Sequence, residues 1–307
     1  MKEEFLRMID IAKSTGPKKL TVACPYHASS LLSSLMAQKD GLAIPILVGD
    51  KNRIMHAAEE DDVDISSLEI IDIKDDQAAC DKAVQLVAEG KADFVMKGLI
   101  DTSVILKAYL KPEFGMRTDK LLSHVAVFNP DSYGKILFVT DASMNIDPDL
   151  DQKRQIIDNA VDVARKMGVE VPKVAVLAAI EKVNPKMPET VEARALQEMN
   201  EKGIIKNSIV AGPLALDNAI FEKAAKIKSI DHPVAGHADI LMVPNIEIGN
   251  ILYKALAFCS GVKHAGVIVG GKKPVVLTSR SDNEFGKYNS IAFAKYLLET
   301  GDGYNKL

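Results

Sequence analysis

The 307-residue sequence has little of several features that define common protein classes. Its three cysteines, Cys24, Cys80 and Cys259, lie far apart without a CxxC pair, which excludes a zinc knuckle and a disulfide framework. With 38 Lys and Arg against 42 Asp and Glu, no positive excess would attract nucleic acid or an anionic membrane. No apolar run approaches the ~18 residues of a membrane span, and the charged N-terminus lacks the apolar core of a signal peptide. These absences predict a cytoplasmic protein that binds neither nucleic acid nor a membrane.

Composition and length indicate a globular protein with more than one core. Hydrophobic residues make up 47% of the chain and charged residues 26%, which is ordinary for a globular protein. At about 150 residues per domain, the length predicts two domains.

The order of apolar and amphipathic segments predicts an α/β protein with mainly parallel sheets. Short runs rich in Val, Ile and Ala, apolar on both faces, are typical of buried parallel strands, and helical patterns lie between most of them. The expected strands are Leu20–Cys24, Ile46–Val48, Leu68–Ile71, Phe94–Met96, Val125–Phe128, Ile136–Val139, Val174–Leu177, Ile209–Val210, Ile240–Val243, Val267–Val269 and Val275–Leu277. The expected helices are Glu4–Lys13, Ser29–Ala37, Gln77–Glu89, Ser103–Leu110, Leu150–Lys166, Thr190–Asn200, Ala215–Lys226, Ile248–Phe258 and Phe285–Leu298.

One interruption of this alternation indicates a domain boundary. The runs Val125–Phe128 and Ile136–Val139 are separated only by the turn-forming residues 129–134, so they read as adjacent strands joined by a turn. We therefore expect the chain to enter a second domain near residue 133. A catalytic cleft is expected between the domains, at the carboxyl ends of strands.

Several motifs fit familiar patterns without the residues that those patterns require. Gly266–Lys273 matches GxxxxGK, but its variable positions are mostly a Val-Ile-Val strand, Lys273 replaces the Mg²⁺-binding hydroxyl, and Pro274 prevents a helix start. No GxGxxG follows an early strand, and the six histidines lack metal-ligand spacing such as HExxH. Nucleotide hydrolysis, dinucleotide binding and a metal site are therefore not predicted.

Two segments carry polar chemistry at the ends of expected strands. Thr278–Asp282 holds a guanidinium, hydroxyls and a carboxylate, and arginine suits bidentate binding of phosphate. Alternatively, Ser281 or Asp282 serves only as the N-cap of the last helix. Gly212–Asp217 reads either as an anion-binding turn that opens a helix or as an ordinary tight strand–helix connection.

Eight segments, in family order, together resemble the phosphate acyltransferases, which comprise phosphate acetyltransferase and phosphate butyryltransferase. The segments are Val95–Gly98 with Thr102, Leu122–Phe128, Val139–Asn145, Val183–Met187, Gly212–Ala219, Val234–Ile240, Glu247–Lys254 and Leu277–Arg280. The variants at Met96–Gly98, Ser123–Val125 and Asp217–Ala219 resemble the butyryl branch more than the acetyl branch.

The resemblance implies a two-domain isocitrate/isopropylmalate dehydrogenase-like fold with an interdomain cleft. Residues 1–132 and 271–307 would form the first domain, and residues 133–270 a second, inserted one. A metal- and NAD-dependent dehydrogenase would share this fold, but it requires clustered aspartates at strand ends, which the sequence lacks.

The implied reaction is the reversible transfer of a short-chain acyl group, butyryl or branched, between CoA and inorganic phosphate through a ternary complex. Acyl-CoA and phosphate are the expected partners, coenzyme A acts as a substrate, and no bound cofactor is expected. A homodimer or larger homo-oligomer is implied. Phosphate acetyltransferase is the alternative, and a non-catalytic sensor of CoA or acyl phosphate is a more distant one.

The resemblance also assigns candidate site residues. Ser279 and Arg280 match the family's phosphate-binding pair. The acetyl members' proton-accepting Asp falls here at Gly286 in an ungapped match, so Asp282 is the first candidate base and Glu284 the second. Lys107 stands where acetyl members have an arginine, although lysine lacks the bidentate geometry. The candidates for substrate binding are Lys97, Thr102, Lys107, Asp141, Asn145, Asn250 and Lys254; for Asn250 and Lys254, an ordinary amphipathic helix is the competing interpretation.

Overall fold

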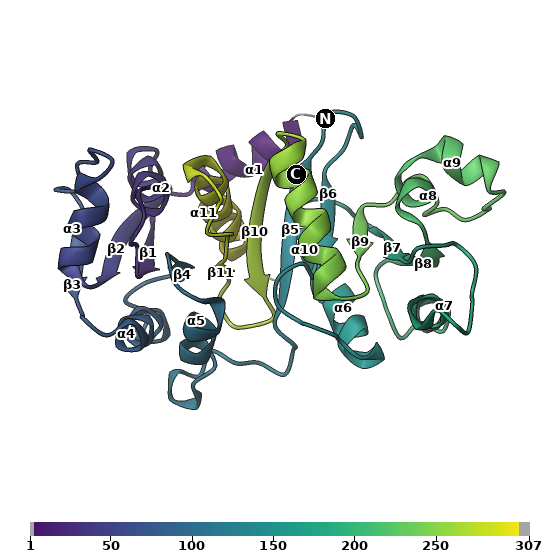
Figure 1. Ribbon diagram of the computed structural model, residues 1–307, viewed down its shortest axis with the longest axis horizontal. Coiled ribbons are helices and arrows are strands. Elements are labelled where there is room, and N and C mark those ends of the chain that lie inside the picture. The colour runs from purple at the N-terminus through teal and green to yellow at the C-terminus, as the bar shows by residue number, and fades with distance from the viewer. Residues whose placement is uncertain (1–2, 301–307) are drawn as a thin grey trace. The chain divides into compact units, whose positions relative to one another are not determined.

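The computed structural model describes residues 3–300, which form two compact units (Figure 1). The terminal unit consists of Leu6–Lys120 together with residues 265–300, and the central unit consists mainly of Leu121–His264. In each unit, hydrogen-bonded strands carry helices on both faces.

Six strands of the terminal unit lie in the order β3-β2-β1-β4-β11-β10. Their bounds are β1 (Lys18–Ala23), β2 (Ala43–Gly49), β3 (Glu69–Asp72), β4 (Phe94–Lys97), β10 (Lys263–Val269) and β11 (Val275–Val276). Neighbours from β3 to β11 run parallel, whereas β10 runs antiparallel to β11. The carboxyl ends of the parallel strands therefore share one edge.

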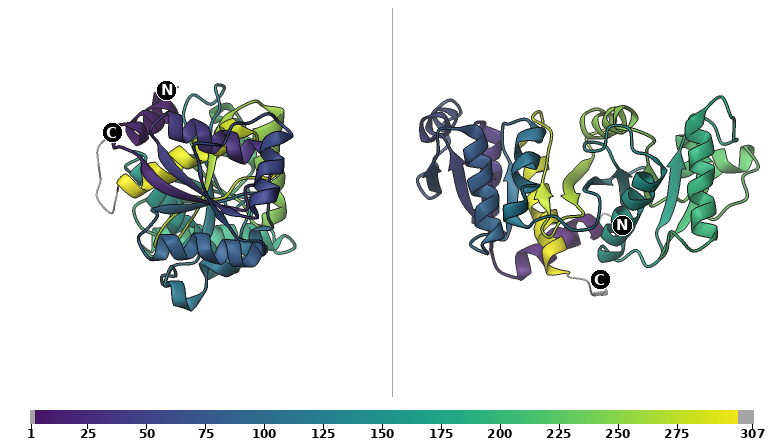
Figure 2. Two further views of the ribbon diagram at one scale, coloured as in Figure 1. Left: turned by 90° about the vertical axis from the view of Figure 1, so that its left-hand side faces the viewer. Right: turned by 90° about the horizontal axis from the view of Figure 1, so that it is seen from below.

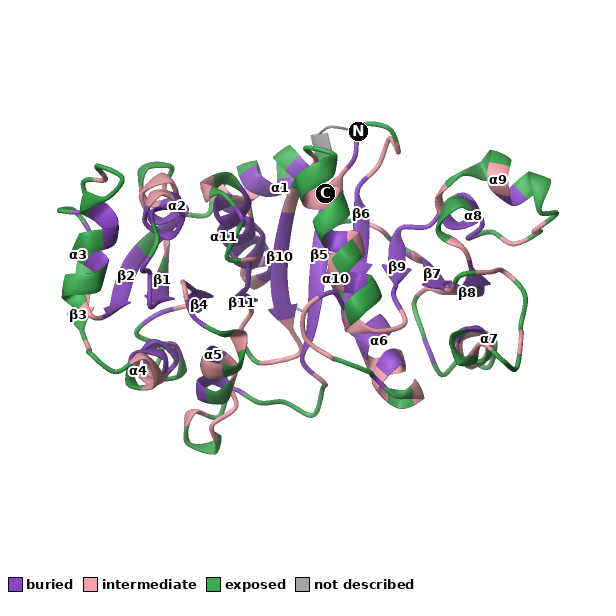
Figure 3. Ribbon diagram, viewed as in Figure 1, coloured by how far each residue is buried: buried purple, intermediate pink, exposed green. Residues whose placement is uncertain are grey.

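The helices of the terminal unit cover both faces of these strands. Their bounds are α1 (Glu3–Ser14), α2 (Ala28–Lys39), α3 (Lys51–Glu59), α4 (Asp76–Ala88), α5 (Thr102–Tyr109), the 3₁₀ turn η1 (Pro112–Phe114) and α11 (Glu284–Glu299). Helices α2 and α11 pack together on one face, and α4 packs with α5 on the other (Figure 2). Figure 3 shows the result: β4 and β11 are buried, the edge strand β3 is not, and α3 is buried along one side only.

The central unit repeats this layered arrangement with five strands in the order β5-β6-β9-β7-β8. Its strands are β5 (Ser123–Asn129), β6 (Leu137–Thr140), β7 (Lys173–Leu177), β8 (Ile209–Leu214) and β9 (Ile240–Met242). Its helices are α6 (Leu150–Lys166), α7 (Pro188–Glu201), α8 (Leu216–Ile220), α9 (Glu222–Ile227), α10 (Ile246–Lys254) and the π-helical turn η2 (Ala255–Cys259). Helices α6 and α7 pack together beneath the strands, while α8 contacts β7 and α10 contacts β6.

The strand and helix order confirms the predicted α/β class, and all eleven expected strands are present. The two runs that flank residues 129–134 are β5 and β6, which pair antiparallel with Phe128 opposite Leu137. Both strands contribute to one hydrophobic core, so the turn between them joins two strands of the same unit. The compact units accordingly divide at residues 120/121, whereas the sequence pattern points to residue 133.

Two helix predictions need correction. The single helix expected over Ala215–Lys226 is broken at Phe221, whose extended backbone separates α8 from α9. At this point Gly236 packs so closely that an added Cβ would lie 2.5 Å from the Cα of Glu222. Helix α3 is absent from the expected helices; it is short, at 9 residues, and buries only Ile54, Ala57 and Ala58.

The positions of β8 and β10 decide how two sequence motifs, Gly212–Asp217 and Gly266–Lys273, are interpreted. Gly212 and Pro213 lie within β8 at a register shift, where these two residues face the single residue Val176 of β7. They therefore belong to a strand, which favours the ordinary strand–helix connection over the anion-binding turn. The GxxxxGK-like segment is strand β10 and the turn after it, as its sequence indicated. The turn is held by Tyr109, whose hydroxyl donates to Lys273 O at 2.5 Å.

Candidate active site

The predicted site residues fall into two groups, one in each unit. Lys97, Thr102, Lys107, Ser279, Arg280, Asp282 and Glu284 belong to the terminal unit. Asp141, Asn145, Asn250 and Lys254 belong to the central unit.

Strand pairing brings together the two separate chain segments that make up the terminal unit. Strand β11 pairs with β4 in parallel, with Val276 beside Met96. The residues after Val276 therefore emerge at the same edge as Lys97, the last residue of β4. Gly98 then passes so close to β1 that an added Cβ would lie 2.2 Å from the carbonyl oxygen of Cys24. Only glycine allows this exit from β4.

Residues Ser279–Asp282 form a closed turn at this edge. The Asp282 amide donates to Ser279 O at 3.1 Å, and the Ser279 amide donates to Asp282 Oδ2 at 2.8 Å. Helix α11 begins at Glu284, and its N-cap is Asn283, whose side chain accepts from the Gly286 amide at 2.9 Å. The alternative that Ser281 or Asp282 is the cap is therefore wrong. Asp282 is buried, and its carboxylate helps to close the turn.

Arg280 lies at the middle of this turn and is exposed. Its Nη2 donates to Asp101 Oδ1 in an ion pair that joins residues 179 positions apart. Asp101 occupies the N-cap position of α5 but makes no side-chain capping bond, so its carboxylate is committed to the arginine. The sequence signal of Asp101 is that of an ordinary helix cap, which is why its contact with Arg280 was missed.

Lys97 is the buried cation of this group, with 3% of its surface exposed. Its Nζ donates to Ile100 O at 3.0 Å and to Gly98 O at 3.3 Å. Burial, followed by the positive charges of Arg280 and Lys287, lowers the pKa of Lys97 to about 8. Binding of an anion beside Lys97 would offset the repulsion between these positive charges and stabilise the protonated lysine.

Lys287 is a second buried lysine of this cluster, and it is not among the residues predicted from the sequence. It lies in the first turn of α11, and its Nζ donates to Ser279 O at 3.4 Å and to Asp282 O. Burial lowers the pKa of Lys287, and the nearby Asp282 and Glu284 carboxylates oppose that shift. The sequence does contain a signal for this residue: a lysine lies on the apolar face of the first helical turn, where a positive charge is unfavourable with the helix dipole.

The remaining candidates of the terminal unit are less closely tied to this cluster. Glu284 is the first residue of α11 and half-buried, and Thr102 is the first residue of α5, next to Asp101. Lys107 is exposed in the last turn of α5, away from the helix start that meets Arg280. Its predicted contact with substrate stays a prediction.

In the central unit, Asp141 organises the loop that follows β6. Its buried carboxylate accepts hydrogen bonds from the amides of Ser143 and Met144, each at 3.0 Å, and from Asn145 Nδ2 at 2.6 Å. Asn145 Nδ2 also donates to Leu122 O at 3.0 Å. Burial raises the pKa of Asp141, and the N–H donors oppose that rise. The structure thus brings Asp141 and Asn145 together in a loop held by its own hydrogen bonds.

Helix α10 packs directly against this loop. A Cβ added to Gly249 would lie 2.7 Å from Asp141 O, so glycine permits the approach. Asn250 follows, with Nδ2 at 3.4 Å from Ala142 O, which places it beside the loop as well. Lys254 lies one turn further along α10 and is exposed.

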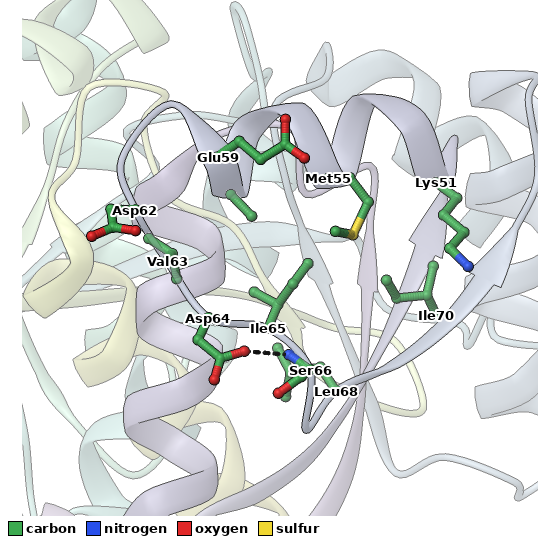
Figure 4. Close-up of a pocket in the computed structure, with 11 residues that line it drawn as sticks. Lys51, Met55, Glu59, Asp62, Val63, Asp64, Ile65, Ser66, Leu68 and Ile70 are labelled. Carbon is green, nitrogen blue, oxygen red and sulfur yellow. Dashed lines mark hydrogen bonds between the residues drawn. The ribbon is translucent and has the colours of Figure 1, made fainter.

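A groove of about 490 Å³ lies beside the edge strand β3 of the terminal unit. Its lining comes from α3 and from the segment that leads into β3, with Met55, Ile65 and Ile70 making it largely apolar (Figure 4). No residue predicted for the site lines this groove, and we assign it no role.

Comparison with known proteins decides the family. Residues 77–295 match the family model described as phosphate acetyl/butaryl transferase. The chain belongs to this family. It is 45% identical to phosphate butyryltransferase from Clostridium acetobutylicum over 294 residues, 96% of this chain and 98% of that protein. It is 44% identical to phosphate acetyltransferase from Thermotoga maritima over 288 residues, 94% of this chain and 97% of that protein.

Solved structures support the family and the fold. A branched-chain phosphotransacylase from Enterococcus faecalis superposes with a TM-score of 0.80 at 36% identity, covering 92% of this chain and 99% of that chain. A 4-hydroxythreonine-4-phosphate dehydrogenase from Klebsiella pneumoniae has a TM-score of 0.54 at 13% identity, covering 92% of this chain and 98% of that chain. The second likeness concerns the fold alone, and it confirms the dehydrogenase-like fold implied for this phosphate acyltransferase. Among the described residues 3–300, no helix is long and apolar enough to cross a membrane.

The lowered pKa of Lys97 predicts a rise in stability with pH. Folded Lys97 loses its proton near pH 8, and the unfolded chain near the ordinary value of 10.5, so the unfolded state binds more protons between these values. The free energy of unfolding therefore rises across this window by about 3 kcal/mol, which is the cost of keeping buried Lys97 protonated at lower pH. Urea unfolding from pH 7 to 10.5 should show this rise for the wild type relative to Lys97→Met. The exposed Lys107→Met is the control and should track the wild type; a flat difference between wild type and Lys97→Met would contradict the assignment.

Proposed function

We propose that this protein transfers a short-chain acyl group reversibly between CoA and inorganic phosphate. The observation that carries the proposal is the cationic cluster of Lys97, Arg280 and Lys287 around the Ser279–Asp282 turn, in a chain that belongs to the phosphate acetyl/butyryltransferases. In the direction of acyl-CoA synthesis, the CoA thiolate attacks the carbonyl carbon of the acyl phosphate. The resulting tetrahedral intermediate collapses with cleavage of the bond to the phosphate oxygen, which releases inorganic phosphate.

This reaction requires three kinds of protein group. A base must accept the thiol proton, because the thiolate is the nucleophile and a free thiol titrates near ~8.5. A cationic group must hold the phosphate dianion, and a further donor must stabilise the oxyanion of the intermediate. Positioning of the two bound substrates supplies much of the rate enhancement.

Arg280 and Ser279 are the proposed phosphate ligands. The exposed guanidinium of Arg280 uses Nη2 for Asp101, and the planar group has further N–H donors for two phosphate oxygens. Asp101 fixes the direction of the arginine from the start of α5, next to Thr102. Lys97 contributes a second positive charge at the same strand edge.

Asp282 is the proposed proton acceptor, and Glu284 is the alternative. Asp282 lies two residues beyond Arg280, buried in the turn, and Glu284 is more accessible at the start of α11. In the central unit, we propose that Asp141, Asn145 and Asn250 bind substrate. The hydrogen bonds of the Asp141 loop give it the rigidity that a binding surface requires.

The acyl group is the finer part of the proposal. The butyryl branch is favoured by the motif variants, while the 44% identity to an acetyltransferase supports acetyl transfer as the second candidate. One methylene of extra room in a pocket is worth only ~1–3 kcal/mol of discrimination.

The first prediction for this function concerns turnover. Butyryl-CoA with inorganic phosphate is expected to release free thiol, followed with a thiol reagent, only when both substrates are present. The value of kcat/KM is expected to be higher for butyryl- and isobutyryl-CoA than for acetyl-CoA by about 10-fold or more. A maximum at acetyl-CoA would favour the acetyl alternative. Binding of CoA without phosphate-dependent thiol release would indicate a sensor.

The second prediction concerns Arg280. Arg280→Gln is expected to raise the KM for phosphate and to lower kcat by about 10²-fold or more, because it removes charge-assisted bonds to the reacting anion. Arg280→Lys is expected to recover little, since one ammonium cannot reproduce a two-point contact. Arg194→Gln, which breaks a comparable exposed ion pair with Glu198 in α7, is the control and should leave the kinetics unchanged. Normal phosphate kinetics in Arg280→Gln would refute the phosphate-ligand assignment.

The third prediction separates the two carboxylates. Asp282→Asn is expected to lower kcat far more than it changes either KM, because the amide keeps the size of the side chain and loses proton acceptance. Glu284→Gln is expected to be mild. The reverse order of severity in steady-state kinetics would make Glu284 the base and leave Asp282 with its role in the turn alone.

A further inference from the structure

The turn that carries Arg280 is held from behind by one side chain. Lys287 Nζ donates to the carbonyl oxygens of Ser279, at 3.4 Å, and of Asp282. These two residues are the ends of the turn, which their own backbone bond closes at 3.1 Å. With both ends held, the middle residues Arg280 and Ser281 are the exposed ones.

The position of Lys287 is unfavourable for a lysine. The residue is 3% exposed, and it lies in the first turn of α11, after the N-cap Asn283, where the helix dipole opposes a positive charge. Burial of an ammonium group also costs free energy unless it is hydrogen-bonded. The charged groups around it are Asp282 and Glu284 from its own end of α11, and Lys97 from β4. An apolar side chain would avoid these costs, so the two carbonyl contacts account for a lysine here.

We propose that Lys287 is a positioning residue for phosphate, which holds the Ser279–Asp282 turn so that Ser279 and Arg280 face the anion in advance of binding. The inference rests on the proposed function, because it takes Ser279 and Arg280 as the phosphate ligands. Lys287 itself acts through the turn: both of its recorded acceptors are main-chain oxygens. A turn already ordered in the free protein loses less conformational freedom when phosphate binds. Small displacements of such ligands are costly in rate, by up to about 10²-fold for 1 Å.

The test is a comparison of two buried lysines on the same helix. Lys287→Met keeps an unbranched side chain, one atom shorter, and removes the donor. Lys295→Met is the matched control, because Lys295 is fully buried in α11 and donates to Ala12 O, far along the helix from the turn. Both variants are expected to lower the thermal midpoint of unfolding. Only Lys287→Met is expected to raise the KM for inorganic phosphate, by about tenfold or more, with the KM for acyl-CoA within about twofold.

A conservative variant adds a second readout. Lys287→Arg keeps N–H donors and charge, and it is expected to recover part of the phosphate affinity. If Lys287→Met does not accumulate as folded protein, Lys287→Gln, which keeps a shorter N–H donor, replaces it, with an expected KM for phosphate between those of wild type and Arg280→Gln. An unchanged KM for phosphate in the folded variant, or equal kinetic effects at positions 287 and 295, would overturn the proposal.

Arg280→Gln separates a failure of the positioning role of Lys287 from a failure of the phosphate site itself. If it raises the KM for phosphate while Lys287→Met does not, the positioning role is wrong and the proposed function stands. If Arg280→Gln leaves phosphate kinetics normal, the phosphate site itself has been placed incorrectly.

Discussion

Parallel pairing of β11 with β4 is the constraint on which the candidate site residues of the terminal unit depend. The pairing sets Val275 beside Val95 and Val276 beside Met96, and it delivers the Ser279–Asp282 turn to the edge where Lys97 ends its strand. Without that register, Arg280 could not reach Asp101, 179 positions away in the sequence. Gly98 completes the arrangement, because a side chain at that position would collide with the backbone of β1.

The site concentrates positive charge in a place where burial disfavours it. Lys97 and Lys287 are both almost fully buried, and each is compensated by main-chain carbonyl oxygens. Carbonyl acceptors keep an ammonium solvated without neutralising its charge. The local field therefore stays available for an incoming anion, at a cost to the stability of the free protein. Such an exchange of stability for binding capacity is common at functional sites.

In the central unit, the main structural feature of the candidate residues is an ordered loop after β6. Asp141 accepts several N–H groups of the residues that follow it, and α10 closes on the same loop through Gly249. These N–H donors lie within four residues of Asp141 in the sequence, so the loop is ordered by local bonds. Asn145 is bound to Asp141 directly, and Asn250 lies beside Ala142.

The sequence by itself determined the α/β class, the strands and most of the helices, because hydrophobic periodicity reports local burial. Its motifs also located Ser279, Arg280 and Lys97 at strand ends and indicated the family. Tertiary structure alone decided the partners of those residues. Asp101 has the signal of a helix cap and Lys287 that of a misplaced surface lysine, and neither contact with the 279–282 turn follows from sequence spacing. The same holds for the break at Phe221, which accompanies the close approach of Gly236 to the start of α9. In each case the deciding contact depends on which segments the strand order places side by side, and one-dimensional periodicity carries no information about that order.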